Sequence, residues 1–289
     1  MNGFVVLDKV GGITSRDAID RLRLILPRGS KFGHTGTLDP LATGVLVVAI
    51  GQATRLADRV QAMGKSYSTT LRLGAATDSN DADGRVSETP NATDPGIERI
   101  AAYLAGMVGT IDQVPPQTSS VKVDGQRSYA LARKGRVADL AARPVRIDAI
   151  RIAAYDWPHL DLEIDCGKGT YIRAIARDLG EALGCGGYVL KLRRDRVGGF
   201  VSSMAIPAAI TRDELERALV PMLVAVSGVP RVDIVPEAAE FLCMGRSLPD
   251  DARLGGEVAI VLHGELFALC ESIEGRLQPH TVLKRREES

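Results

Sequence analysis

The chain has 289 residues, of which 45% are apolar and 25% are charged. This composition excludes a disordered chain, and the length is sufficient for one large domain or two smaller ones. Lys plus Arg and Asp plus Glu both number 36, so the formal net charge is zero and no overall field indicates a polyanionic partner. The charge is unevenly distributed, however. Basic and acidic residues number ten and five over residues 1–72, seven and two over 113–146, and four and one over 187–200, which permits one basic face toward RNA.

Membrane, secretion and metal signals are weak throughout the chain. The longest purely apolar stretch, residues 45–50, is far shorter than the roughly 20 residues of a membrane span, and the start, MNGFVVLDK, does not resemble a secretory signal. We therefore expect a cytoplasmic protein. The four cysteines are widely separated, as is typical of reduced, buried thiols, and the four histidines form no close pair. Stretches similar to a P-loop, a calcium loop and a dinucleotide fingerprint each lack required residues, so no metal or cofactor is expected.

The first elements are predicted from apolar runs and capping signals. Residues 4–7 suit a buried strand, and Thr14 with Asp17 has the spacing of a helix capping box. A helix with one apolar stripe should follow and end at Pro27, before a polar, glycine-rich loop at 31–43. The stripe consists of Ala18, Ile19, Leu22 and Leu26.

Strands alternate with turns further along the chain. The β-branched run 45–50 favours a central strand, and the alternation over 67–73 predicts a half-buried strand. Residues 77–84 have turn composition, and 160–166 is the clearest strand pattern. Thr170 is predicted to cap a helix.

That helix should run to Gly184, with its apolar residues at helical spacing. From about Arg231 the pattern changes to a short helix at 236–245 and strands at 257–263 and 265–271, which indicates a small β-rich C-terminal domain.

The loop at 33–44, GHTGTLDPLATG, carries the most chemistry. It combines one carboxylate, one imidazole and three hydroxyls with three glycines. Proline disfavours helical backbone in the residue before it, so Asp39 should point out of an extended or turn conformation toward a substrate. The alternative is an ordinary loop in which Asp39 caps a turn, and composition alone favours that alternative.

Arg173 gives a second indication. A cation in the first turn of a helix faces the positive end of the helix dipole, so a compensating carboxylate is expected beside it. Such an ion pair would keep the acid ionised at neutral pH, as a nucleophile or general base requires. The alternative is a solvated arginine on a helix surface.

Eight sequence blocks between residues 3 and 200 occur in order and at consistent spacing. They are GFVVLDKVGGITS at 3–15, KFGHTGTLDPLATGVL at 31–46, KSY at 65–67, LGAATDSNDADG at 73–84, QVPP at 113–116, KVDGQRSYALARKG at 122–135, GKGTYIRAIARDLG at 167–180 and KLRRDRVGGF at 191–200. Together they resemble the TruB family, the bacterial tRNA pseudouridine synthases that act on the TΨC loop. The 59 residues from Arg231 to the end more weakly resemble a PUA-type RNA-binding module.

The resemblance implies a fold and an activity. The fold is α+β, with a pseudouridine-synthase-like mixed, largely antiparallel sheet and flanking helices at 1–230, and a small PUA-like β domain at 231–289. The activity is isomerisation of uridine to pseudouridine in the T loop of tRNA, after the base has been flipped out of its stack. No cofactor, metal or guide RNA is implied, and we expect a monomer.

The resemblance also assigns site residues. Asp39 would be the catalytic carboxylate, attacking C1′ or the base, or taking the C2′ proton. Tyr67 would stack on the flipped uracil and assist removal of the C5 proton, and Arg173 would pair with Asp39. The other implied substrate-binding residues are His34, which would fill the space left in the RNA, Tyr171, which would line the pocket, and Leu192, which would pack near the base.

The chain departs from the family pattern at three positions. Val10 replaces a proline, and Thr118 and Ser120 replace an aromatic residue and an alanine. None of them is expected to touch the catalytic residues. The basic segment 124–146, with Tyr129, resembles a flexible loop that clamps the tRNA arm, and its alternative is an exposed charged helix.

Two other functions compete with this interpretation. One is a guide-RNA-dependent synthase of the archaeal or eukaryotic type, which shares the GTLDP region. The other is a non-catalytic tRNA-binding or RNA-folding protein. The bacterial-like GHTGTLDPLATG and the segment 124–146 argue against the first, and the joint presence of Asp39, Tyr67 and Arg173 argues against the second.

Overall fold

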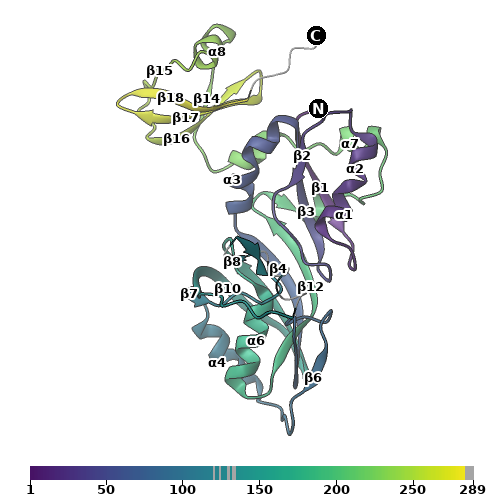
Figure 1. Cartoon of the computed structure of the whole chain (residues 1–289). Helices are drawn as coiled ribbons and strands as arrows, with labels where there is room; N and C mark the ends of the chain where they lie inside the picture. Colours follow the sequence, from purple (N-terminus) through teal and green to yellow (C-terminus); the bar gives the residue numbers. More distant parts are fainter. Residues whose placement is uncertain (120, 124, 129–130, 132–134, 284–289) are drawn as a thin grey trace.

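The computed structural model describes residues 1–119, 121–123, 125–128, 131 and 135–283. These residues form an elongated molecule with a nine-stranded sheet in its body and a five-stranded sheet at one end (Figure 1). The path through the large sheet is β1 (Gly3–Lys9), β3 (Thr43–Ile50), β12 (Gly187–Val197), β4 (Lys65–Leu73), β11 (His159–Cys166), β10 (Arg143–Asp156) and β7 (Gly109–Gln113), with β2 (Phe32–His34) beside β3 and β13 (Phe200–Val201) beside β12.

The large sheet is mixed and largely antiparallel, as expected. Its parallel pairing joins β12 to the start of β3, with Arg194 opposite Gly44. Gly44 has a φ of 94°, and a Cβ atom there would lie 2.3 Å from the carbonyl oxygen of Arg194. Only glycine therefore allows β12 to approach the chain directly after the Asp39 loop.

The N-terminal helical region differs from its prediction in two places. Thr14 does form the capping box with Asp17, but the expected single helix is divided at Arg21 into α1 (Ser15–Asp20) and α2 (Leu22–Ile25). The expected loop at 31–43 also contains β2, which pairs with β3 from Phe32 opposite Ile50. Backbone pairing with a neighbouring strand therefore orders a segment whose polar, glycine-rich composition indicates a loop.

The second predicted helix is α6 (Ile172–Leu183), which follows the predicted strand β11. It ends as expected at Gly184, whose φ of 70° is the left-handed conformation of a helix C-cap. Its start was predicted wrongly. Tyr171 is the N-cap residue, and the Thr170 hydroxyl donates to the carbonyl oxygen of Gly167 at 3.2 Å.

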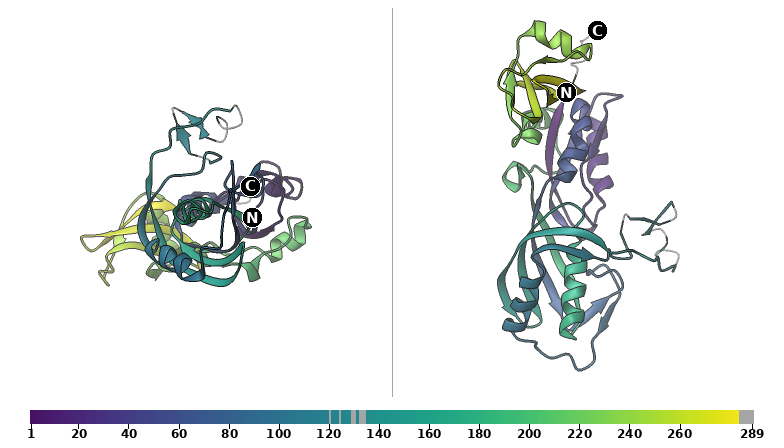
Figure 2. Two further views of the ribbon diagram at one scale, coloured as in Figure 1. Left: turned by 90° about the horizontal axis from the view of Figure 1, so that it is seen from below. Right: turned by 90° about the vertical axis from the view of Figure 1, so that its left-hand side faces the viewer.

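The remaining elements are short or cover the large sheet. The elements are α3 (Ala57–Ala62), α4 (Ile97–Gly106), α7 (Arg212–Arg217), the 3-10 helices η1 (Gly51–Leu56), η2 (Ser202–Met204) and η3 (Met222–Val226), and the strands β5 (Ala75–Thr77), β6 (Val86–Glu88), β8 (Lys122–Val123) and β9 (Gln126–Arg127). Of the described residues between β7 and β10, those of β8 and β9 project from the body of the molecule (Figure 2).

The two faces of the large sheet carry separate apolar cores. Side chains alternate along a strand, so Leu46, Val48 and Ile50 of β3 pack on one face, and Val45, Val47 and Ala49 on the other. The first face is covered by α1, α2, α4 and α6, and its core includes Tyr67 and Leu192. We call it the helix face. The opposite core includes residues of the C-terminal sheet, such as Leu269.

The C-terminal region folds around its own sheet and core. Its hairpin turns at His263 and Gly264, which have positive φ angles of 52° and 78°, between two strands near their predicted positions. The elements are β14 (Arg231–Asp233), α8 (Pro236–Cys243), β15 (Leu248–Pro249), β16 (Gly256–Leu262), β17 (Glu265–Ile273) and β18 (Arg276–Val282). No helix in the described part of the chain is long and apolar enough to cross a membrane.

Candidate active site

The Asp39 loop runs between β2 and β3. The backbone N–H of Ala42 donates to the carbonyl oxygen of Asp39 at 3.1 Å, which closes a turn with main-chain groups alone. The Asp39 side chain is therefore not needed to form the turn. It is 32% exposed and contacts Arg173.

Three buried side chains from distant parts of the chain fix this loop. The Ser15 hydroxyl accepts from the Leu38 N–H at 2.8 Å and donates to the Leu38 carbonyl at 2.9 Å. The Lys9 ammonium donates to the carbonyl oxygens of Pro40 at 3.0 Å and Ala42 at 2.7 Å. These contacts hold the backbone on both sides of Asp39. Burial lowers the pKa of Lys9 to about 8, against the opposing effect of the Asp39 charge.

The third side chain is Arg194, on β12. Its guanidinium donates to the carbonyl oxygens of Val45 at 2.8 Å, Gly36 at 3.1 Å and Thr37 at 3.3 Å. It is 2% exposed, and no carboxylate in the described residues lies within ion-pairing distance of it. Carbonyl dipoles therefore solvate this cation, and its charge acts on the groups around the loop.

Arg173 and Asp39 form the central ion pair. Arg173 Nη2 donates to Asp39 Oδ1 at 3.1 Å, and Nε lies 2.9 Å from Oδ2 without forming a hydrogen bond. Its side chain is only 4% exposed, which excludes the solvated arginine considered from the sequence. The structure thus places beside Arg173 the carboxylate that its position in the helix requires.

Asp81 is a second carboxylate beside Arg173 that the sequence analysis missed. Its Oδ2 lies 3.4 Å from Arg173 Nη1, and its side chain is 5% exposed. Burial raises the pKa of Asp81, while the Ser79 hydroxyl and the Arg173 charge oppose this shift. The turn that carries Asp81 is attached to β12, because the Val189 N–H donates to the Asn80 carbonyl at 3.1 Å.

Thr118 completes the surroundings of Arg173 and corrects one expectation. Its hydroxyl accepts from Nη1 at 2.6 Å and its carbonyl from Nη2 at 3.0 Å, so this departure from the family pattern does touch a candidate catalytic residue. The Ser79 carbonyl accepts from Nη1 at 2.9 Å. Of the other departures, Val10 is exposed, and Ser120, like Tyr129, lies outside the described residues.

Tyr67 and Leu192 lie on the helix face of neighbouring strands. Tyr67 of β4 is opposite Arg194 of β12, and Leu192 is opposite Thr69. Their side chains are 9% and 8% exposed. Burial raises the pKa of Tyr67, and the nearby Arg194 opposes this rise, so the phenol is neutral at neutral pH.

His34 and Tyr171 lie at the two sides of this region. His34 is half-buried on β2, and its Nδ1 is buried with no hydrogen-bond partner among the described residues. Burial lowers the pKa of His34, as do the charges of Arg194 and Arg16. The Tyr171 side chain packs against the small apolar cluster of Val121, Ala138 and Leu140, so its expected lining role stays a prediction.

A hollow of about 470 Å³ adjoins the strands that carry Tyr67 and Leu192. Leu41, Thr43, Thr69 and Leu192 are among its lining residues, whereas Asp39 and Arg173 are not. Among the described residues, the structure therefore brings Asp39, Arg173 and Asp81 together as one charged cluster, next to the buried Tyr67, Leu192 and Arg194.

Family models match most of the chain. A model described as "TruB family pseudouridylate synthase (N terminal domain)" matches residues 23–172, and one described as "tRNA pseudouridylate synthase B C-terminal domain" matches residues 173–225.

Known proteins agree with these matches. A protein of Mycobacterium sp. (strain KMS) named tRNA pseudouridine synthase B is 43% identical over 286 residues, which cover 98% of this chain and 96% of that protein. A protein of the same name from Gloeobacter violaceus is 41% identical over 297 residues, with 98% and 99% coverage. Among solved structures, a chain of a Cbf5-Nop10-Gar1 complex has a TM-score of 0.73 and 25% identity, over 98% of this chain and 85% of that one. The chain therefore belongs to the TruB family of pseudouridylate synthases, which makes it an isomerase.

Proposed function

We propose that the protein converts uridine to pseudouridine in the T loop of tRNA, with Asp39 as the catalytic carboxylate. The observation that carries this proposal is the ion pair between the part-exposed Asp39 and the buried Arg173. Both relatives described above are named tRNA pseudouridine synthase B, which supports tRNA as the substrate.

The reaction moves the uracil from one ring atom to another. The bond between C1′ and N1 breaks, a bond between C1′ and C5 forms, the C5 proton leaves, and N1 takes up a proton. Asp39 serves by attack on C1′, by attack on the base, or by removal of the C2′ proton. Each route needs the ionised carboxylate, and Arg173 places a positive charge 2.9 Å from Asp39 Oδ2.

Tyr67 is proposed to stack on the flipped uracil. Its aromatic ring belongs to the core of the helix face, next to the strand that carries Leu192, and aromatic rings bind unstacked bases by stacking. Because its pKa is raised, the phenol holds its proton at neutral pH. This favours stacking over removal of the C5 proton by Tyr67.

We further propose that the protein acts as a monomer, without guide RNA, and that residues 231–289 form a PUA-like RNA-binding domain. The bacterial relatives are 41–43% identical to this chain, compared with 25% for the chain of the Cbf5 complex. His34, Tyr171 and the segment 124–146 are proposed to contact the RNA around the flipped base.

The test uses an unmodified tRNA transcript labelled with tritium at uridine C5. Wild-type protein is expected to release tritium, and Asp39→Asn is expected to release none, because the amide cannot act as a carboxylate. A transcript with cytidine at the T-loop position should also abolish release. Binding without release by the wild type would favour the non-catalytic alternative, and release from the cytidine transcript would refute the T-loop assignment.

A further inference from the structure

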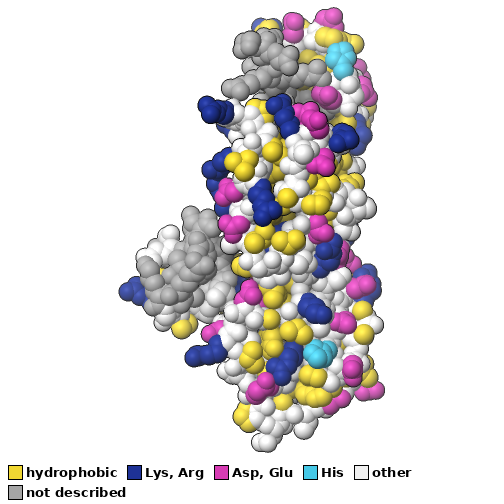
Figure 3. Space-filling model, turned by 90° about the vertical axis from the view of Figure 1, so that its right-hand side faces the viewer, with side chains coloured by type: hydrophobic (Ala, Val, Ile, Leu, Met, Phe, Trp, Pro, Cys, Tyr) yellow, Lys and Arg dark blue, Asp and Glu magenta, His cyan; other side chains and the backbone are white. Residues whose placement is uncertain are grey.

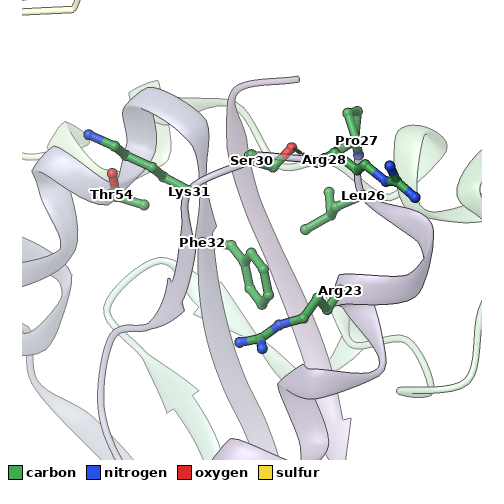
Figure 4. A pocket seen from close by; sticks show the side chains of 9 residues that line it. Arg23, Leu26, Pro27, Arg28, Ser30, Lys31, Phe32 and Thr54 are labelled. Carbon is green, nitrogen blue, oxygen red and sulfur yellow. Dashed lines mark hydrogen bonds between the residues drawn. The ribbon is translucent and has the colours of Figure 1, made fainter.

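A hollow of about 690 Å³ lies outside the candidate active site, between the end of α2, the start of β2 and η1. Phe32 stands in its middle, with the guanidinium of Arg23 beside it (Figure 4). Lys31 and Thr54 lie on one side of Phe32 and Arg28 on the other (Figure 4). Three cations between residues 23 and 31 thus line the hollow, with that of Arg23 beside the aromatic ring.

The charge of this hollow is largely uncompensated. None of its lining residues is acidic. Arg28 and Lys31 are exposed, and neither pairs with a carboxylate of the described residues. Arg23 shares Asp20 with Arg16, at 3.4 and 3.1 Å. The hollow is therefore a local positive site. By contrast, Lys and Arg are interspersed with Asp and Glu on the face of the molecule drawn in Figure 3.

The ring of Phe32 gives the hollow an apolar surface as well. Phe32 is half-buried, and the Arg23 guanidinium carbon lies 5.9 Å from its ring centroid, a cation–π distance. Cations that share a hollow with a part-exposed aromatic ring suit a ligand with phosphates and sugar or base faces. They do not suit an apolar ligand.

Strand β2 connects the hollow to the candidate active site. Phe32 and His34 are two residues apart, so both side chains lie on the same face of β2. Phe32 packs against the core of the helix face, which also contains Tyr67 and Leu192. At 3.3 Å per residue, Lys31 is about 10 Å along the strand from His34. An RNA strand that passes His34 would therefore meet the hollow next.

We propose that the basic hollow of Arg23, Arg28, Lys31 and Phe32 binds the phosphate backbone of the tRNA beyond the loop that delivers the uridine. This inference rests on the proposed function, because it takes tRNA as the substrate. It extends the RNA-binding surface along β2, away from the catalytic loop.

The test is the salt dependence of tRNA binding by Arg28→Gln/Lys31→Gln. Each phosphate contact contributes about 0.7 to 0.9 to the slope of log K against log salt. The double variant is therefore expected to lower the slope by about one to two between 50 and 200 mM salt. The charge-matched control is Arg99→Gln/Arg151→Gln. Arg99 lies on α4. Arg151 pairs with Glu163 across two strands, and its side chain lies on the face of the sheet that does not carry Tyr67.

The outcomes separate this inference from the proposed function. If the wild type releases tritium but both double variants keep its slope, the hollow does not bind the tRNA backbone and the inference is wrong. If Arg28→Gln/Lys31→Gln lowers the slope while the wild type releases no tritium, the hollow binds RNA and the proposed function fails. AMP is the second ligand tested. If Arg28→Gln/Lys31→Gln loses AMP binding but keeps the wild-type salt slope for tRNA, the hollow binds a small nucleotide and the proposal is overturned.

Discussion

Replacing Arg173 by alanine tests whether the ion pair with Asp39 sustains turnover. The substitution leaves Asp39 and the buried Asp81 without their shared cation. Breaking a buried ion pair by removing one partner costs about 3 to 5 kcal/mol, so the free energy of unfolding should fall by about that amount. Loss of one preorganised charge partner in an active site lowers kcat by roughly 100- to 1000-fold.

Affinity for tRNA should change far less than turnover, because phosphate contacts dominate nucleic-acid binding. Arg173→Lys is the second variant. It keeps the positive charge but loses the planar fork that reaches Asp39 and Thr118 together, so its turnover should lie between those of the wild type and Arg173→Ala.

Three measurements are needed for each variant: tritium release under single-turnover conditions, tRNA binding on filters, and urea unfolding. Urea unfolding at the assay temperature shows whether each variant is folded there, and tritium release is then compared between folded proteins. Wild-type turnover in a folded Arg173→Ala would refute the pairing role. So would a loss of turnover that saturating enzyme fully restores, because the defect would then lie in binding alone.

The other predictions concern groups around Asp39 and the binding of tRNA. Asp81→Asn should lower kcat roughly tenfold, because Arg173 loses one of its two carboxylates, and a wild-type kcat would contradict this role of Asp81. Urea unfolding of the same variant should show a stability change within about 1 kcal/mol, since a buried charge with a raised pKa is removed. Thr118→Val removes the 2.6 Å hydrogen bond to Arg173, and we expect a loss of stability of about 1 kcal/mol by urea unfolding. Folding lowers the pKa of Lys9 from 10.5 to about 8. Between these pH values the unfolded chain binds more protons than the folded chain, so the free energy of unfolding should rise with pH. In Lys9→Met that rise should be smaller, and a rise equal to that of the wild type would count against the pKa shift. Binding of tRNA to the wild type should weaken steeply with salt, and an affinity independent of salt would exclude a phosphate-dominated interface.

The local elements could be read from the sequence because their signals are short-range. The capping box at Thr14, the alternation of β4 and β11, and Gly184 at the end of α6 each depend on neighbours a few residues away. Such short-range signals do not predict the secondary structure of a segment that tertiary contacts determine. Strand β2 forms in a segment with loop composition because β3 supplies its hydrogen-bond partners.

The candidate site was predicted in part for the same reason. Asp39 is identified by its loop and by the family resemblance, and Arg173 by its place at a helix start. Asp81, Thr118 and Arg194 were not predicted as site residues. Asp81 lies in a stretch of ordinary turn composition, Thr118 is a departure from the family pattern, and Arg194 is one of several basic residues on β12.

The sequence by itself determined the family, the strand and helix types, and the loop that carries the candidate carboxylate, because motifs and periodicity are properties of contiguous residues. Only the tertiary structure decided that Arg173 contacts two carboxylates and Thr118, that Arg194 lies behind the Asp39 loop, and that three cations meet around Phe32. The three cations come from residues 23–31, close to Phe32 in the chain, but the first two arrangements join segments far apart. Their proximity is set by the order of strands in the sheet, above all by β12 packing beside β3 at Gly44, and no local pattern encodes that order.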